Sequence, residues 1–216
     1  MFKESLPALA AWAAGAVLMW ALFRFTHWRV FVVPGAVFGL LLLFTLYFFR
    51  DPERIVPEGG HRIVSPADGQ VVDISDVEET SFMGGKAVRV AIFLSVWDVH
   101  VNRVPVDGRV TYCSYRKGKF LRAFEPEASA VNERMDIGIE SPAGRFLVRQ
   151  IAGIIARRIV CRVREGDAVA RGARFGMIKF GSRTELFLPA GVTLRVQVGE
   201  RVKGGETIIG EFLNAS

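Results

Sequence analysis

The chain repeats one ten-residue pattern: Val163-Arg164-Glu165-Gly166-Asp167-Ala168-Val169-Ala170-Arg171-Gly172 recurs 33 residues later as Val196-Gln197-Val198-Gly199-Glu200-Arg201-Val202-Lys203-Gly204-Gly205. Both copies follow V-x-x-G-[DE]-x-V-x-x-G. Glycines at these positions suit sharp turns between successive strands, and valines fill the face of a sheet. The repeat therefore predicts two similar β-hairpin units.

Strand-like runs extend outward from the repeat, each short and bounded by glycine or another turn residue. They cover residues 70–74, 87–94, 108–112, 135–139, 145–151, 176–180, 184–188 and 193–198. Short strands at this spacing are typical of an all-β sandwich or barrel. We therefore expect a mainly β fold, a compact barrel or sandwich of quasi-repeated hairpins similar to lipoyl and biotinyl domains. Residues 154–159 are expected to form a helical turn at most.

Two long apolar runs precede the β-rich part. Residues 6–23 and 30–49 contain no charge, and each run is long enough to cross about 30 Å of hydrocarbon as a helix. A cleaved signal peptide is the alternative for the first run, but the second, longer run follows after only six residues. We expect a two-helix transmembrane hairpin over residues 1–50, followed by a β-rich domain over residues 51–216.

The charge pattern favours a partner with anionic lipid headgroups. From Arg50 onward the chain has 25 Lys and Arg against 21 Asp and Glu, a net charge of +4. No helix-turn-helix, zinc-finger or aromatic RNA-binding signature accompanies this charge, so we expect no nucleic-acid partner. Basic residues flank the two apolar runs almost equally, and we place the domain at the cell membrane on the cytoplasmic face.

Cysteine and the other common metal ligands do not cluster along the chain. Cys113 and Cys161 are far apart and lie in apolar runs, so each is expected to be a small buried hydrophobe. No group of His, Cys, Asp and Glu has ligand spacing, and we expect no metal dependence.

Three polar positions have both a structural and a functional interpretation. The Gly181-Ser182 pair separates two strand-like runs and is by itself consistent with a simple bend. Asp68 lies in the turn Ser65-Pro66-Ala67-Asp68-Gly69, where a turn residue needs no further role. His100 follows the apolar strand 87–94, and a lone histidine in such a place is often a satisfied structural group.

Five short motifs, taken in order, point to a family. They are Ser65-Pro66-Ala67-Asp68-Gly69, Asp98-Val99-His100-Val101-Asn102-Arg103-Val104-Pro105, Tyr115-Arg116-Lys117-Gly118-Lys119-Phe120, Asn132-Glu133-Arg134 and Phe180-Gly181-Ser182-Arg183. With these motifs the chain resembles the short, archaetidylserine decarboxylase-like form of phosphatidylserine decarboxylase. The resemblance covers nearly the whole chain, including the paired apolar helices.

The resemblance implies a proenzyme that cleaves itself between Gly181 and Ser182. The Ser182 hydroxyl would attack the Gly181 carbonyl, and elimination followed by hydrolysis would convert Ser182 into a pyruvoyl cofactor. Residues 1–181 and 182–216 would remain together as a heterodimer, because the repeats on either side of the cut are expected to share one sheet. The family uses an Asp-His-Ser arrangement for this step, and Asp68 and Ser182 match it directly.

The histidine matches less directly. Long-form relatives carry two histidines three residues apart; His100 matches the first, and Arg103 occupies the second position. We expect His100 to serve decarboxylation as a proton donor or carboxylate partner and to assist cleavage. Arg103 is expected to contact an oxyanion or phosphate, and Asn132 and Arg134 are read as framework and headgroup contacts.

The resemblance also implies the reaction. Loss of carbon dioxide from the serine headgroup leaves a carbanion, and no side chain offers a ketone to delocalise it. The pyruvoyl ketone would form a Schiff base with the substrate amine and accept those electrons. Phosphatidylserine would give phosphatidylethanolamine, and an ether lipid with a serine headgroup presents the same groups.

Two other functions fit parts of the sequence. A membrane-tethered carrier domain of the biotinyl or lipoyl type fits the repeat and would be modified at Lys179, although carrier lysines lie at exposed hairpin tips. A non-catalytic adaptor would require no role for Asp68, His100 and Ser182.

Overall fold

The computed structural model describes residues 5–121, 128–153, 159–179 and 182–212. The chain divides into two compact units, Met1–Pro52 and Glu53–Ser216. The first consists of helix α1 (Leu6–Thr26), the 3₁₀ turn η2 (Arg29–Phe31) and helix α2 (Val32–Phe48). Both helices are long and apolar enough to span a membrane, as the sequence predicted.

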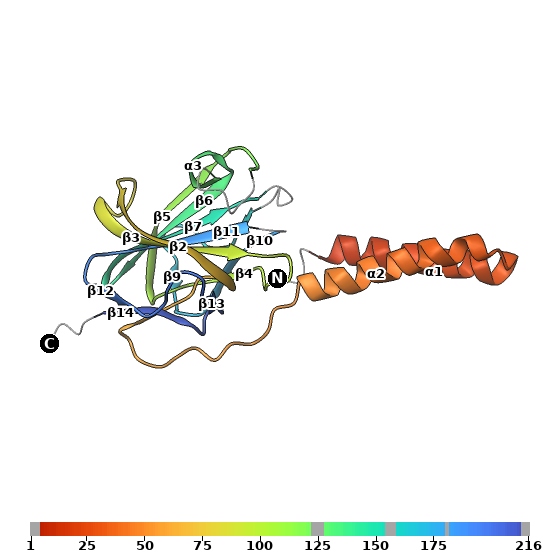
Figure 1. Ribbon diagram of the computed structural model, residues 1–216, viewed down its shortest axis with the longest axis horizontal. Helices are drawn as coiled ribbons and strands as arrows, with labels where there is room; N and C mark the ends of the chain where they lie inside the picture. The colour runs from red at the N-terminus through yellow and green to blue at the C-terminus, as the bar shows by residue number, and fades with distance from the viewer. Residues whose placement is uncertain (1–4, 122–127, 154–158, 180–181, 213–216) are drawn as a thin grey trace. The chain divides into compact units, whose positions relative to one another are not determined.

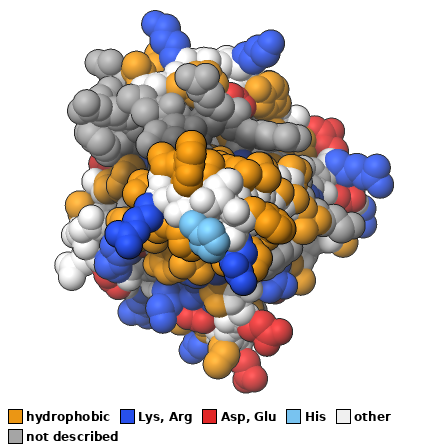
Figure 2. All heavy atoms as spheres, turned by 90° about the vertical axis from the view of Figure 1, so that its right-hand side faces the viewer, with side chains coloured by type: hydrophobic (Ala, Val, Ile, Leu, Met, Phe, Trp, Pro, Cys, Tyr) orange, Lys and Arg blue, Asp and Glu red, His pale blue; other side chains and the backbone are white. Residues whose placement is uncertain are grey.

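The two helices form a hairpin through close ring contacts and a left-handed C-cap. His27 closes α1 with φ 56°, and its N–H donates to the Phe23 carbonyl. A Cβ on Gly15 would lie 2.9 Å from the Phe38 ring, so glycine is needed where that ring packs. Figure 2, which looks along the hairpin from its turn, shows mainly hydrophobic side chains with basic residues and a histidine among them.

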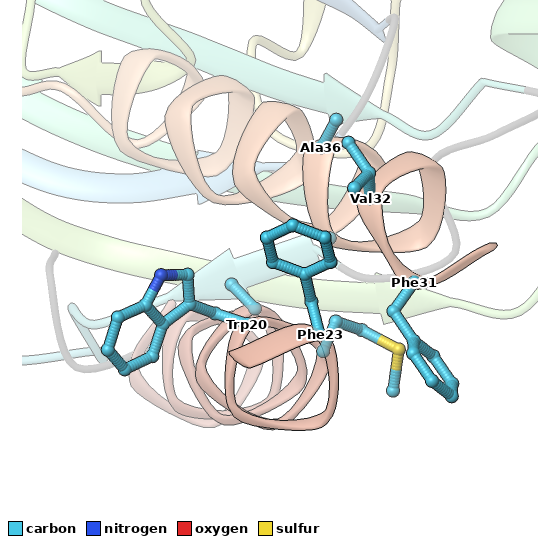
Figure 3. Close-up of a pocket in the computed structure, with 8 residues that line it drawn as sticks. Trp20, Phe23, Phe31, Val32 and Ala36 are labelled. Atoms are coloured by element: carbon cyan, nitrogen blue, oxygen red, sulfur yellow. The ribbon is translucent and has the colours of Figure 1, made fainter. Parts of the chain in front are cut away.

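A groove of ≈ 400 Å³ lies between the helices near their turn. Trp20 and Phe23 from α1 line it together with Phe31, Val32 and Ala36 from the facing segment (Figure 3). Its lining is almost entirely apolar and contains none of the predicted site residues.

The second unit is built from antiparallel strands, which confirms the mainly β prediction (Figure 1). An eight-stranded sheet has the order β13-β2-β3-β11-β7-β6-β5-β9, and two three-stranded sheets have the orders β1-β14-β12 and β4-β10-β8. The bounds are β1 Arg62–Val64, β2 Gly69–Glu79, β3 Gly85–Leu94, β4 Val101–Arg103, β5 Gly108–Arg116, β6 Arg134–Ser141, β7 Gly144–Ile151, β8 Ile159–Cys161, β9 Ala168–Val169, β10 Arg174–Ile178, β11 Ser182–Leu188, β12 Val192–Leu194, β13 Arg201–Val202 and β14 Ile208–Phe212. A short helix, α3 (Ala128–Val131), precedes β6.

The sequence repeat supplies the two edges of the large sheet. The first copy contains β9 and the second contains β13, which lie at opposite ends of the strand order. Gly166 and Gly199 both have positive φ, and their N–H groups donate to the carbonyls of Val110 and Val71 in equivalent bonds of 2.8 Å. The glycines of the pattern therefore occupy left-handed turns that only glycine adopts readily.

One hydrophobic core lies between the inner face of the large sheet and the two small sheets. Ile92, Phe146 and Leu186 come from central strands of the large sheet and are fully buried. Ile63 and Phe175 from the small sheets pack into the same cluster. Successive side chains of β11 point to opposite faces of the sheet. Leu186 and Leu188 face this core, and Phe187 packs with Leu147 on the other face.

Several predicted boundaries differ from the structure. The run 193–198 forms strand only as far as Leu194, because the second repeat turns there toward β13. Of the predicted helical turn 154–159, residues 154–158 lie outside the described residues and Ile159 begins β8. The shortest strands were not predicted, since two or three residues carry no recognisable period.

Candidate active site

The register of the large sheet places one end of five strands side by side. Phe93, Arg183, Ile151, Arg134 and Arg116 pair in sequence across β3, β11, β7, β6 and β5. We call the region beyond this row the site end. Asp68, His100 and Ser182 all lie there, because β2 starts at Gly69, β3 ends at Leu94 and β11 starts at Ser182.

Ser182 begins a central strand and is fully buried. It pairs with Leu94 of β3. Because side chains alternate along a strand, Ser182 lies on the same face as Thr184 and Leu186, which is the core side of the sheet. Its Oγ has no hydrogen-bond partner among the described residues. Burying a hydroxyl without a partner costs free energy, and such a group in a native fold is a candidate for chemistry. Phe180 and Gly181 lie outside the described residues, so the structure does not describe the predicted scissile bond.

His100 is also fully buried, and its ring is oriented by the backbone. Its Nδ1 lies 2.9 Å from the carbonyl oxygen of Asp98, so a proton on Nδ1 donates to that oxygen and the lone pair of the neutral ring is on Nε2. Asp98 is itself held, because its carboxylate accepts bonds from the Ser95 N–H and hydroxyl and from Arg201. This turn therefore fixes the tautomer and direction of the imidazole.

Two short chain connections bring His100 to the start of β11. The carbonyl of His100 accepts a bond from the Ile178 N–H at 3.4 Å, and Ser182 follows Ile178 by four residues. On the other side, Leu94 pairs with Ser182 and precedes His100 by six residues. His100 therefore lies beside the end of β10, and Ser182 begins β11; a contact between the two side chains stays a prediction.

Asp68 reaches the site end from the turn before β2. Its Oδ1 accepts a bond of 2.8 Å from the Gly204 N–H, and its Oδ2 accepts one of 2.7 Å from Arg54. Burial raises the pKa of Asp68, and this effect exceeds the lowering by the Gly204 hydrogen bond and by Arg54; nearby Asp98 raises it further. Asp68 is thus a carboxyl that holds a proton more readily than an ordinary aspartate, with Arg54 as its principal cation.

Sequence reasoning missed a polar cluster beside Ser182. Asn102 donates to Thr184 Oγ1 at 3.1 Å and to the Pro66 carbonyl at 3.4 Å, and Gln150 donates to Asn102 Oδ1 at 2.8 Å. Asn102, Gln150 and Thr184 are all fully buried. The strand period contains a signal for two of them, because Thr184 follows Ser182 by two residues and Asn102 follows His100 by two. The cluster joins β4, β7 and β11 at the site.

Arg103 and Asn132 both donate hydrogen bonds to backbone carbonyls, and the predicted oxyanion or phosphate contact of Arg103 stays a prediction. Arg103 donates to the Gly172 carbonyl at 3.0 Å and passes close to Gly205, on the opposite side of β4 from Asn102. The Asn132 amide accepts from the Leu121 N–H and donates to the carbonyls of Leu121 and Ala152. Both of its amide hydrogens are used within the framework, and its predicted headgroup contact stays a prediction.

Arg134 was predicted to contact the substrate headgroup, and Lys179 was the lysine that a carrier domain would modify. Arg134 donates to the Ser129 carbonyl at 3.0 Å and lies 3.7 Å from Asp136, and its role toward a substrate stays a prediction. Lys179 follows β10 and precedes β11, which belong to different sheets. It therefore does not occupy the tip of a hairpin, where a carrier lysine would lie.

A charged cluster lies on the outer face of β11. Glu185 is fully buried, accepts a bond of 2.5 Å from Ser129, and lies 2.9 Å from Arg183, 3.8 Å from Arg89 and 3.9 Å from Arg149. These contacts connect β11 to β3, β7 and α3. These hydrogen bonds and ion pairs hold the first half of β11 in the sheet through residues that follow position 181.

Within the described ranges no group of three or more His, Cys, Asp and Glu is arranged to hold a metal ion. Cys113 and Cys161 are free thiols, and burial raises the pKa of Cys113 to about 11, with Cys161 adding to the effect. Neither cysteine has the lowered pKa of a nucleophile.

Comparison with known proteins identifies the family. A model of the phosphatidylserine decarboxylase family matches residues 41–210. A phosphatidylserine decarboxylase proenzyme of Carboxydothermus hydrogenoformans is 53% identical over 82% of this chain and 84% of the relative. Those of Symbiobacterium thermophilum and Citrifermentans bemidjiense are 49% and 42% identical, over 97% and 96% of this chain and 94% of each relative. The predicted resemblance and the prediction of an enzyme are thereby confirmed: this chain belongs to the phosphatidylserine decarboxylase family.

Proposed function

We propose that this chain decarboxylates phosphatidylserine to phosphatidylethanolamine and carbon dioxide, using a pyruvoyl group made from its own Ser182. The observation that carries the proposal is the position of Ser182 at the start of a central strand, with a buried hydroxyl that lacks a partner among the described residues. The relatives are named proenzymes, which agrees with activation by cleavage.

Self-cleavage would start with Ser182 Oγ. The oxygen attacks the Gly181 carbonyl carbon and its proton passes to His100. The Gly181–Ser182 C–N bond then breaks as the ester forms, and His100 returns the proton to the departing Ser182 nitrogen. Removal of the Ser182 α-proton expels the Gly181 carboxylate and leaves a dehydroalanine. Water then enters at the α-carbon and ammonia leaves, which gives the pyruvoyl group. The orientation of His100 by the Asp98 carbonyl supports this role, because it directs the lone pair to Nε2.

The residues around Ser182 suit a pyruvoyl group formed in place. Thr184 and Asn102 hold the strand on the core side, and Glu185 holds it on the outer side. The pyruvoyl ketone supplies an electron sink for the carbanion left by carbon dioxide. His100 would donate the proton that replaces the carboxylate, and Asp68, with its raised pKa, would exchange a proton during cleavage or orient the substrate amine.

The two fragments, 1–181 and 182–216, would remain joined after cleavage. The smaller fragment contains β11, which pairs with β3 on one side and β7 on the other, and also β13 and β14. A central strand that left the sheet would lose its backbone hydrogen bonds on both sides. We therefore expect a stable heterodimer.

Intact-mass measurement tests the cleavage. The purified protein should contain two fragments, with the smaller starting at residue 182 and carrying no free amino group. Ser182→Ala should leave one full-length species, whereas Ser114→Ala on β5 should cleave normally. A single uncleaved species in the active wild-type protein would refute the pyruvoyl mechanism.

We also infer that the protein resides in the cell membrane with its β domain on the cytoplasmic face. The two apolar helices support membrane residence. Protease digestion of sealed spheroplasts and of inverted vesicles tests the orientation, because the domain should be cut only in inverted vesicles. An ether lipid with a serine headgroup remains a second candidate substrate, and a competition assay between the two lipids distinguishes them.

A further inference from the structure

We propose that the site end carries a membrane-docking rim, formed by Trp97, Tyr115, Arg116, Lys117 and Lys119, which binds the headgroups of an anionic lipid surface. The inference deepens the proposed function, since it assigns the surface that would bring the site to its lipid. It concerns contact with the bilayer and does not depend on the chemistry at Ser182.

The first part of the rim is the turn after β3. Trp97 lies between Ser95 and Asp98, and its side chain is 64% exposed. Tryptophan favours the membrane–water boundary, where its ring contacts apolar chains and its N–H stays hydrated. The neighbouring Asp98 is nearly buried and paired with Arg201, whose side chain is 67% exposed. The exposed charge beside Trp97 is therefore positive.

The second part is the segment after β5. Tyr115 is 56% exposed, and Arg116, Lys117 and Lys119 are exposed as well. The segment is held in place, because the Lys119 N–H donates to the Val131 carbonyl at 2.7 Å and the Lys119 carbonyl accepts from Glu133 at 3.0 Å. The basic side chains thus extend from a defined backbone.

The two parts flank the site at the same end of the sheet. Phe93 and Arg116 belong to one row of paired residues. Tyr115 lies just before that row on β5, Lys117 and Lys119 follow it, and Trp97 lies three residues beyond the end of β3. Four strand spacings separate β3 from β5, which amounts to about 19 Å, with β11 and Ser182 between them. An exposed aromatic on one side and three cations on the other match a lipid surface rather than a single small anion.

Fluorescence of Trp97 tests the proposal in the full-length chain. Trp12, Trp20 and Trp28 are replaced by Phe, and Ser182→Ala is added so that turnover plays no part. The protein is placed in nanodiscs that contain brominated lipid, with either phosphatidylglycerol or only zwitterionic phosphatidylcholine. Trp97 should be quenched in the phosphatidylglycerol discs, and the quenching should fall in 1 M salt because charge interactions are then screened.

Matched charge variants locate the contact. Lys117→Gln with Lys119→Gln should weaken docking by about 25-fold, since each basic side chain near an anionic surface contributes about five-fold. Lys86→Gln with Arg145→Gln removes two cations from the opposite end of the sheet and should leave the quenching unchanged. Equal quenching of Trp97 in both kinds of disc, or equal effects of the two double variants, would overturn the proposal.

The test separates the rim from the proposed function. Quenching of Trp97 in the Ser182→Ala variant, together with no lipid decarboxylation by the wild-type protein, would support the rim and refute the enzyme proposal. A protein that decarboxylates lipid without quenching of Trp97 would refute the rim alone.

Discussion

Replacing Arg54 with glutamine should move the pH dependence of self-cleavage. Arg54 is the cation that contacts Asp68, at 2.7 Å, and the two side chains are only 7% and 14% exposed. Glu206 lies 3.5 Å from Arg54, and Asp98 acts on Asp68 as a second negative charge. Loss of Arg54 therefore leaves Asp68 near carboxylates with no compensating cation among its named partners.

The magnitude follows from the contact. An opposite charge at this distance lowers a carboxyl pKa by about 1 to 3 pH units, so its removal should raise the pKa of Asp68 by that amount. Burial already raises this pKa, and the two effects have the same sign. If Asp68 acts as a carboxylate, the acid limb of the cleavage profile should move to higher pH by about 1 to 3 units.

Cell-free synthesis provides the assay, because the proenzyme can be made at low pH and its cleavage followed by gel after transfer to a series of buffers. Arg54→Lys keeps the charge and should restore most of the wild-type profile. Arg171→Gln is the matched control, since Arg171 binds the carbonyls of Pro57, Gly59 and Arg62 in the same segment without contacting Asp68. An acid limb unchanged in Arg54→Gln, or moved equally in Arg171→Gln, would refute the reasoning.

Three further predictions concern stability. Glu185→Gln should lower the free energy of unfolding of the Ser182→Ala protein by about 3–5 kcal/mol in urea, because it leaves the guanidinium of Arg183 buried without its carboxylate; a loss below 1 kcal/mol would contradict this. Burial raises the pKa of Glu79, but hydrogen bonds from the following turn outweigh burial and leave the pKa lowered. The ionised Glu79 therefore stabilises the folded protein, and this contribution should be lost as the pH falls below about 4.5. In thermal melts, Glu79→Gln should make the melting temperature depend less on pH in this range. Gly69→Ala should prevent normal folding, since a Cβ there would lie 2.2 Å from the carbonyl oxygen of the neighbouring strand; a soluble variant with a wild-type melting temperature would exclude the predicted clash.

The sequence was sufficient for features that depend on local spacing. Two uncharged runs predicted the apolar helices, and alternation with glycine predicted most long strands, because apolar length and strand period are properties of neighbouring residues. The valine-glycine repeat predicted two equivalent turns, and the structure gives Gly166 and Gly199 equivalent bonds. The order of five motifs was enough to predict the family.

Only the tertiary structure decided which residues accompany Ser182. Gln150 and Asn102 are 48 residues apart, and Asn102 and Thr184 are 82 apart, so no local pattern links them. The contact of Arg54 with Asp68 likewise depends on how the segment before β1 lies on the domain. Sequence alone determined the kinds of element and the candidate Ser182; strand register and the packing of small sheets on the large one determined its neighbours, because long-range pairing is set by the whole core rather than by any one segment.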